Sequence, residues 1–224
     1  MKFIIRVLVF LLKKLASRGR AIDYFTNKKD HLLLYRISPY LEEIGWIRSA
    51  ELQSSVNNLG ESIPWLTYSF LDFLSPRLND EMVIFEFGSG NSTDFFSTKV
   101  SHVFSVEHEQ EWYDKREDKS NVTLIFNSLD SDNYEKTIGS LDRSFDLVIV
   151  DGRKRVKCLS QSVKYLRNDG VIVLDDSERA DYSSGVEFMI SIGYKHIQFW
   201  GLAPGVNYKK CTSVFYKEHN CLKL

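Results

Sequence analysis

The sequence is poor in the residues that mark several protein classes. Its 224 residues include three cysteines, four prolines and twelve glycines. The cysteines Cys158, Cys211 and Cys221 form no C-x-x-C pair, which argues against a disulfide framework and a zinc knuckle. This cysteine usage favours a reducing compartment, and we expect a cytoplasmic protein. The low proline and glycine content excludes collagen and low-complexity chains.

An excess of charge of one sign is also missing. Twenty-nine basic residues face thirty acidic ones, which gives a net charge of −1. The overall charge therefore predicts no nucleic-acid partner. The chain is 43% hydrophobic and 26% charged, as in folded domains, and it is long enough to bury roughly 70–75% of its unfolded surface. We expect one large domain, or one domain with a small appendage.

Residues 1–20 break this even charge with six basic side chains and no acidic one. Their apolar run, residues 3–12, is too short to span a membrane, which takes about 20 residues. Basic residues follow this run where a signal-peptide cleavage site would lie. As a helix, residues 1–20 suit peripheral contact with the anionic inner face of a membrane. Packing of that helix on protein is the alternative. We expect a helical extension over residues 1–60 and a main domain over residues 61–224.

From residue 82 onward, short apolar runs alternate with helix-length segments. The predicted strands are residues 83–87, 103–106, 122–126, 145–150, 170–174, 196–200 and 212–216. The predicted helices are residues 62–74, 93–100, 109–116, 133–140, 156–166 and 182–192. Some of the strands are apolar on both faces, which is typical of a parallel sheet with helices on both faces. The sequence therefore predicts an α/β fold.

A glycine turn follows the first predicted strand. Gly88 and Gly90 permit a tight turn and the close approach of a ligand to the backbone. Glu107 stands 21 residues after Glu86, at the end of the second predicted strand, where doubly wound folds place an acid that binds ribose hydroxyls. Dinucleotide binding is the alternative, but Thr93 replaces the third glycine of G-x-G-x-x-G.

The motif E-F-G-S-G-N-S-T, followed by S-V-E-H and a Trp-Tyr pair, resembles the class I S-adenosylmethionine (SAM)-dependent methyltransferases. The resemblance covers residues 64–217. It implies a Rossmann-like seven-stranded methyltransferase sheet whose last strand, near residues 213–216, is antiparallel. It also implies that SAM is bound by the turn and by the ends of the second and fourth strands. The expected SAM contacts are Glu86, Gly88, Ser89, Gly90, Asn91, Ser92, Glu107, His108 and Asp151.

Three acids follow two of the buried strands. Asp151 comes directly after residues 145–150, and Asp175 and Asp176 come after residues 170–174. The ends of neighbouring strands open into one crevice, where three carboxylates would repel each other without a cation. Mg²⁺ or Mn²⁺ would suit these oxygen ligands. The trio resembles the metal-dependent O-methyltransferases of the catechol and antibiotic-sugar types.

The catechol type has a lysine as general base three residues beyond the first acid, and Lys154 holds that place. Arg153 and Arg155 depart from this pattern. They are able to neutralise the acids without a metal, and an aspartate would then take the proton. Both alternatives stay open, and the catalytic candidates are Asp151, Lys154, Asp175 and Asp176.

Arg153, Arg155, Arg179 and Tyr182 lie beside the acids in D-G-R-K-R and D-D-S-E-R-A-D-Y. Arginine binds carboxylates and phosphates, and tyrosine stacks on sugar rings, so we expect these four to bind the methyl acceptor. Surface salt bridges are an equally good interpretation. The combination resembles small bacterial methyltransferases found among genes for surface polysaccharides.

These observations predict a SAM-dependent methyltransferase that O-methylates a saccharide or glycoconjugate hydroxyl. The alternatives are a small-molecule N-methyltransferase, a nucleotide-binding oxidoreductase and a catalytically silent, membrane-associated scaffold.

Overall fold

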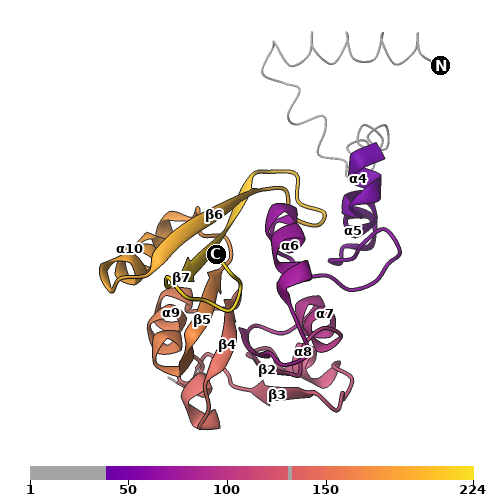
Figure 1. The fold of residues 1–224 in the computed structure, drawn as a ribbon. Helices are drawn as coiled ribbons and strands as arrows, with labels where there is room; N and C mark the ends of the chain where they lie inside the picture. Colours follow the sequence, from indigo (N-terminus) through magenta and orange to yellow (C-terminus); the bar gives the residue numbers. More distant parts are fainter. Residues whose placement is uncertain (1–38, 131–132) are drawn as a thin grey trace, which may run out of the picture.

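The computed structural model describes residues 39–130 and 133–224 (Figure 1). The predicted basic helix over residues 1–20, and with it the predicted membrane contact, lies outside these residues. Within the described part of the chain, every helix is too short or too polar to cross a bilayer.

A single mixed sheet forms the centre of the described chain. Its strands are β1 (Val83–Phe87), β2 (His102–Glu107), β3 (Val122–Phe126), β4 (Phe145–Val150), β5 (Leu166–Leu174), β6 (Lys195–Gly201) and β7 (Lys210–Tyr216). They lie in the order β3-β2-β1-β4-β5-β7-β6. Strands β1 to β5 are parallel, and β7 pairs antiparallel with both β5 and β6. The predicted seven-stranded α/β sheet with an antiparallel last strand is confirmed.

Helices cover both faces of this sheet (Figure 1). They are α4 (Pro39–Glu43), α5 (Trp46–Leu52), α6 (Tyr68–Leu74), α7 (Asn91–Ser97), α8 (Gln110–Asp114), α9 (Arg155–Ser162) and α10 (Ser183–Ser191). In β4, Leu147 and Ile149 face the core that α4 to α7 cover, while Val148 and Val150 face the core under α9 and α10. Alternate residues of one strand thus enter two cores, which explains its unbroken apolar sequence.

The predicted helix over residues 62–74 is wrong in its first half. Ser62 forms a bridge with Val56, and α6 begins only at Tyr68. The reason is tertiary: the Thr67 N–H donates to Thr212 Oγ1 at 3.1 Å, and the Thr67 hydroxyl donates to the Phe199 carbonyl at 3.1 Å. These bonds hold Thr67 against β6 and β7, so that the helix begins only after it.

Two other predicted helices also change. The predicted helix over residues 133–140 is a 3-10 helix at Thr137–Leu141. The one over residues 156–166 begins at Arg155 and ends at Ser162, and a 3-10 turn follows it over Val163–Tyr165. Leu166 already opens β5, because it pairs with Phe145 of β4. Another 3-10 turn, Ala180–Tyr182, precedes α10.

The described part of the N-terminal extension packs onto the domain. Leu41, Trp46 and Ile47 belong to the same core as Leu66 and Phe70. The Trp46 indole N–H donates to the Val206 carbonyl at 2.8 Å. Helices α4 and α5 are thereby held beside the carboxyl ends of the strands, where they are able to contribute a wall to a site.

A substitution at Gly45, which precedes α5, tests the packing of the N-terminal helices on the domain. Its φ is +80°, and an added Cβ would lie 2.6 Å from the Asn57 Cα. Gly193 has a similar φ of +88° but open space around a Cβ. We expect Gly193→Ala to lower the free energy of unfolding by roughly 1–2 kcal/mol, the cost of left-handed backbone. Gly45→Ala should cost roughly 1–3 kcal/mol more, because of the clash. Chemical denaturation measures both, and equal losses would contradict the packing.

Candidate active site

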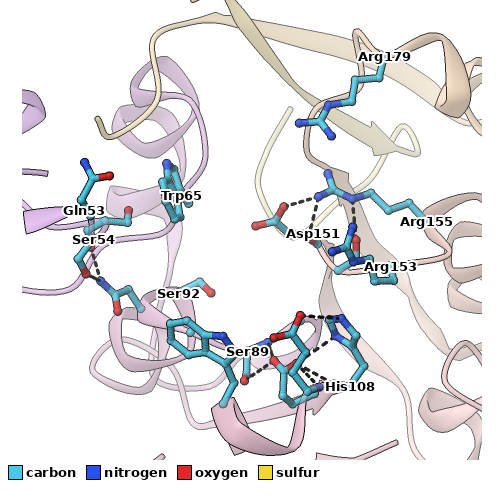
Figure 2. A pocket seen from close by; sticks show the side chains of 18 of the residues that line it. Gln53, Ser54, Trp65, Ser89, Ser92, His108, Asp151, Arg153, Arg155 and Arg179 are labelled. Carbon is cyan, nitrogen blue, oxygen red and sulfur yellow. Dashed lines mark hydrogen bonds and ion pairs between the residues drawn. The ribbon is translucent and has the colours of Figure 1, made fainter. Parts of the chain in front are cut away.

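A cavity of about 340 Å³ opens at the carboxyl ends of β1, β2 and β4 (Figure 2). The loops after these strands and after β5, together with two segments before α6, contribute its lining. The lining residues are Gln53, Ser54, Ser55, Trp65, Gly88, Ser89, Gly90, Asn91, Ser92, Glu107, His108, Glu109, Trp112, Asp151, Gly152, Arg153, Arg155, Arg179 and Tyr182. The structure therefore brings together twelve of the residues expected to bind SAM or acceptor. It leaves Glu86, Lys154, Asp175 and Asp176 outside the lining.

The glycine turn has two glycines with different roles. Gly88 has a φ of +95°, and a Cβ there would lie 3.1 Å from the Gly152 Cα, so the turn itself requires this glycine. Gly90 has extended backbone, and nothing lies within 4 Å of an added Cβ. Since Gly90 lines the cavity, any side chain there would take space from a ligand.

Glu86 lies beneath the turn and is fully buried. Its Oε2 accepts hydrogen bonds from Thr93 at 2.6 Å and from Ser105 at 3.3 Å, while its Oε1 has no hydrogen-bond partner. Burial raises the pKa of Glu86 to about 7, although these hydroxyl donors counteract part of the effect. The predicted direct contact of Glu86 with SAM is not supported, because this side chain braces the turn from below.

Glu107 is the acid that the cavity exposes at the end of β2. Its Oε1 accepts from the backbone N–H groups of His108 and Glu109 at 2.7 and 2.9 Å. Its Oε2 accepts from the Ser89 N–H at 3.0 Å and the Ser89 hydroxyl at 2.8 Å. Burial favours the neutral acid, but these four hydrogen bonds outweigh it and lower the pKa of Glu107. An ionised carboxylate is thus joined directly to the glycine turn.

Asn91 connects the turn to the N-terminal wall of the cavity. Its amide Nδ2 donates to Ser54 Oγ at 2.8 Å and to the Ser55 carbonyl at 2.6 Å. Both amide protons of Asn91 are therefore occupied by the wall, so this residue anchors residues 53–55.

Several lining residues were not predicted from the sequence, namely Gln53, Ser54, Ser55, Trp65, Glu109, Trp112 and Gly152. Residues 53–55 carry no sequence motif that indicates a site. They reach the cavity because Asn91, which is 36 or 37 positions away, forms hydrogen bonds with Ser55 and Ser54. Trp65 falls within the helix predicted over residues 62–74, yet the side chain is 46% exposed, and that of Trp112 is 54% exposed. Two exposed indoles in one cavity offer flat apolar surfaces to a ligand ring.

The two acids after β5 are buried and neutralised by cations. Asp175 Oδ2 lies 2.8 Å from Lys210 Nζ, and Asp175 Oδ1 accepts from the Thr212 hydroxyl at 2.8 Å. Asp176 lies 2.8 Å from Lys210 Nζ through Oδ1 and 2.6 Å from Arg179 Nη2 through Oδ2. Burial raises the pKa of Asp175, and Lys210 opposes that effect.

This arrangement corrects the expected metal site on Asp151, Asp175 and Asp176. Lys210 already lies against both Asp175 and Asp176, where an ion would have to bind. Within residues 39–130 and 133–224, no group of three His, Cys, Asp or Glu side chains is placed to hold a metal. The alternative, in which cationic side chains neutralise the acids without a metal, agrees better with the structure. The cations are Arg155, Arg179 and Lys210, whereas Arg153 and Arg155 were expected.

Arg155 ties the loop after β4 to the loop after β5. Its Nε donates to the Gly152 carbonyl at 2.9 Å, and Nη1 donates to the Asp175 carbonyl at 2.6 Å. Nη2 donates to the Asp151 carbonyl at 2.8 Å and lies 3.0 Å from Asp151 Oδ1. A longer bond of 3.4 Å from Nη1 reaches Asp176. These partners account for all five N–H groups. The expected acceptor contact of Arg155 is therefore limited to its face, which lies near the Tyr182 ring.

Lys154 does not reach the cavity. Its Nζ lies 3.4 Å from Glu135 Oε2, so the predicted general base is not supported by the geometry. Asp151 does line the cavity, and its Oδ2 has no partner among the described residues. Burial and nearby Asp175 raise the pKa of Asp151, while Arg155 acts in the opposite direction. Asp151 is the one member of the acidic trio that a ligand in this cavity meets.

Comparisons with known proteins place the fold. No protein-family model matches the sequence, and no curated protein matches it. An rRNA methylase structure from Streptococcus thermophilus is 16% identical, with a TM-score of 0.52 over 65% of this chain and 92% of its own. Precorrin-6y C5,15-methyltransferase from Geobacter metallireducens is 18% identical, with a TM-score of 0.54 over 67% and 87%.

A third similar structure is the O-methyltransferase TomG from Streptomyces achromogenes, in complex with SAM. It is 16% identical, with a TM-score of 0.50 over 65% of this chain and 78% of its own. The fold of this chain is therefore that of the class I SAM-dependent methyltransferases, as the resemblance implied. The three proteins have different names and acceptors, so the likeness leaves the acceptor open.

The buried Glu86 makes stability depend on pH. Its pKa is about 7 in the folded protein and 4.5 as the ordinary value. Ionisation is thus harder in the folded state, and this carboxyl removes stability as pH rises from 4.5 to 7. Glu86→Gln imitates the neutral acid and keeps an oxygen for Thr93. We expect it to raise the free energy of unfolding at pH 8, by at most about 3 kcal/mol.

Below pH 4.5 the advantage of Glu86→Gln should vanish, because both proteins are then neutral at this position. Urea denaturation at pH 4.5, 6 and 8 measures it. The exposed Glu81→Gln is the control and should change stability little at any of these pH values. A Glu86→Gln protein that is less stable than the native protein at pH 8 would refute the assignment.

Proposed function

We propose that this protein is a SAM-dependent methyltransferase that transfers a methyl group to a hydroxyl of a saccharide or glycoconjugate. The observation that carries the proposal is the joining of Glu107 to the glycine turn through Ser89, at the mouth of one cavity. An acid after the second strand and a glycine turn after the first are the two parts that hold a nucleoside in doubly wound folds.

The described residues fit SAM. Gly90 faces open space where a Cβ would intrude, so the turn admits a ligand close to its backbone. All four acceptor positions of Glu107 are occupied by Ser89, His108 and Glu109. Of these donors, only the Ser89 hydroxyl is able to rotate away without moving the backbone. A ribose hydroxyl would therefore bind Glu107 in place of the Ser89 hydroxyl, with His108 and Trp112 beside the base.

SAM supplies a methyl group on a sulfonium, which is already a reactive electrophile. The main task of the protein is then to align the acceptor, and alignment is able to supply about 7–11 kcal/mol of the barrier. A sugar hydroxyl must also lose its proton. Asp151 fits this role, because its Oδ2 faces the cavity and its raised pKa favours accepting a proton. Arg155 holds Asp151 by its other oxygen and so orients it.

Support for a saccharide acceptor comes from other residues of the lining. Trp65 and Tyr182 offer aromatic faces, and Gln53 and Ser54 offer polar groups. Aromatic faces with nearby amide and hydroxyl groups suit a hydroxylated ring, which is apolar on its faces and polar at its edge. The resemblance to methyltransferases found among polysaccharide genes points to the same class of acceptor.

The turn provides the first test of SAM binding. Gly90→Val should lower the affinity for S-adenosylhomocysteine at least about tenfold, because two methyl groups would fill the ligand space. The extended backbone of Gly90 tolerates valine, so the melting temperature should change little. Glu107→Ala should also weaken binding, by roughly 1.5–3 kcal/mol for each charged hydrogen bond lost. Isothermal titration calorimetry measures both. Unchanged affinity in both folded variants would reject the SAM site.

Catalysis by Asp151 is tested with methyl-tritiated SAM and a panel of sugars and sugar derivatives. With an acceptor that is labelled, Asp151→Asn should slow transfer roughly 10²–10⁴-fold while retaining S-adenosylhomocysteine binding. Lys154→Met should stay within a few-fold of the native rate, and EDTA should not abolish transfer. A methyl group transferred to a hydroxyl forms an ether, which survives mild alkali. A methyl ester is hydrolysed, so alkali treatment distinguishes the two products. An active Asp151→Asn protein, or full loss with Lys154→Met, would overturn the assignment.

A further inference from the structure

We propose that Arg153 forms an oxyanion subsite, so that the methyl acceptor carries a phosphate or carboxylate group beside the hydroxyl that is methylated. This inference rests on the proposed function and deepens it by naming the class of acceptor. It separates Arg153 from Arg155 and Arg179, which sequence analysis treated as one group.

The charges of the loops after β4 and β5 are matched, with one exception. Asp175 and Asp176 share Lys210, Asp176 also pairs with Arg179, and Asp151 pairs with Arg155. Three acids therefore meet three cations. Arg153 is a fourth cation on these loops. It is an exposed residue of the cavity wall, and its guanidinium has no ion pair or hydrogen bond among the described residues.

Unmatched charge at the wall of a cavity points to a ligand of opposite charge. A guanidinium presents paired N–H donors in a plane, which fit the paired oxygens of a carboxylate or phosphate. The Trp65 indole N–H and the Tyr182 hydroxyl have no hydrogen-bond partner among the described residues, and both groups are able to donate to an anion. Asp151 lines the same cavity and has one carboxylate oxygen, Oδ2, without a partner among the described residues. A ligand with an anionic group and a hydroxyl would satisfy Arg153 and Asp151 together.

The cavity is lined by acidic as well as basic side chains. Glu107 and Glu109 lie at the β2 end, with Glu109 half exposed, and they repel an anion. Arg153 lies on the same side of the cavity as Asp151 and across from Trp65 (Figure 2). An acceptor whose ring lies against Trp65 would place its anionic group at Arg153 and its hydroxyl at Asp151.

The experiment reads Arg153 directly by its reaction with phenylglyoxal, a reagent for free arginines, followed by peptide mass spectrometry. The protein is saturated with S-adenosylhomocysteine in a buffer without phosphate or borate. Inorganic phosphate and acetate are then added separately as probes. We expect Arg153 to stay reactive in the complex and at least one anion to slow its modification severalfold. Arg143, an exposed arginine away from the cavity, is the control within the same molecule and should be unaffected.

The two anions distinguish the source of the negative charge. Stronger protection by phosphate indicates a phosphorylated acceptor, and stronger protection by acetate indicates an acidic sugar. Protection of neither, or equal protection of Arg153 and Arg143, would overturn the proposal. If S-adenosylhomocysteine alone shields Arg153, the guanidinium binds the amino-acid carboxylate of that ligand, and the proposal is also wrong.

Matched variants complete the test by calorimetry. Arg153→Gln should weaken binding of the protecting anion to the S-adenosylhomocysteine complex by about tenfold or more. Arg143→Gln makes the same change of net charge and should leave that affinity unaltered. Both variants should bind S-adenosylhomocysteine like the native protein. Native protein that fails to bind S-adenosylhomocysteine would reject the methyltransferase function, whereas equal anion binding by the two variants would reject only the subsite.

Discussion

The candidate site depends on the guanidinium of Arg155. This one group binds the backbone carbonyls of Gly152, Asp151 and Asp175, and so joins the loops after two neighbouring strands. It also holds one oxygen of Asp151, which leaves the other to face the cavity. A planar donor with five N–H groups is able to satisfy several carbonyls at once, whereas a lysine ammonium has three. The shape of the acceptor end of the cavity follows from this single side chain.

Lysine and arginine side chains of this chain determine which of the three acids, Asp151, Asp175 and Asp176, is available to a ligand. Lys210 comes from β7, the antiparallel strand that pairs with β5, and this pairing brings it against Asp175 and Asp176. Buried carboxylates need either a metal or a cationic partner, because ionised groups without one are strongly disfavoured away from water. Lys210 and Arg179 meet that need for two of the acids. Asp151 remains as the carboxylate available to a ligand.

The other end of the cavity is organised around hydrogen bonds to Glu107. Two backbone N–H groups of its own loop fix one oxygen, and Ser89 of the glycine turn fixes the other. The acid is therefore ionised and pre-oriented before a ligand arrives, which reduces the ordering that binding must bring about. The cavity is thus lined by a carboxylate, Glu107, and by a guanidinium, Arg153.

Sequence by itself determined the sheet and the turn. A run such as residues 145–150 is apolar on both faces, which by itself indicates a buried strand. Gly88 and Gly90 likewise indicate a tight turn that a ligand is able to approach, so the local sequence was sufficient to predict both features. The partners of Lys154, Arg155 and Asp175 were decided only by the tertiary structure. A side chain of this length reaches several neighbours, and residues 20 or 35 positions away, on other strands, settle which one it meets. The wall at residues 53–55 was invisible for the same reason, since only the folded chain places it against the turn.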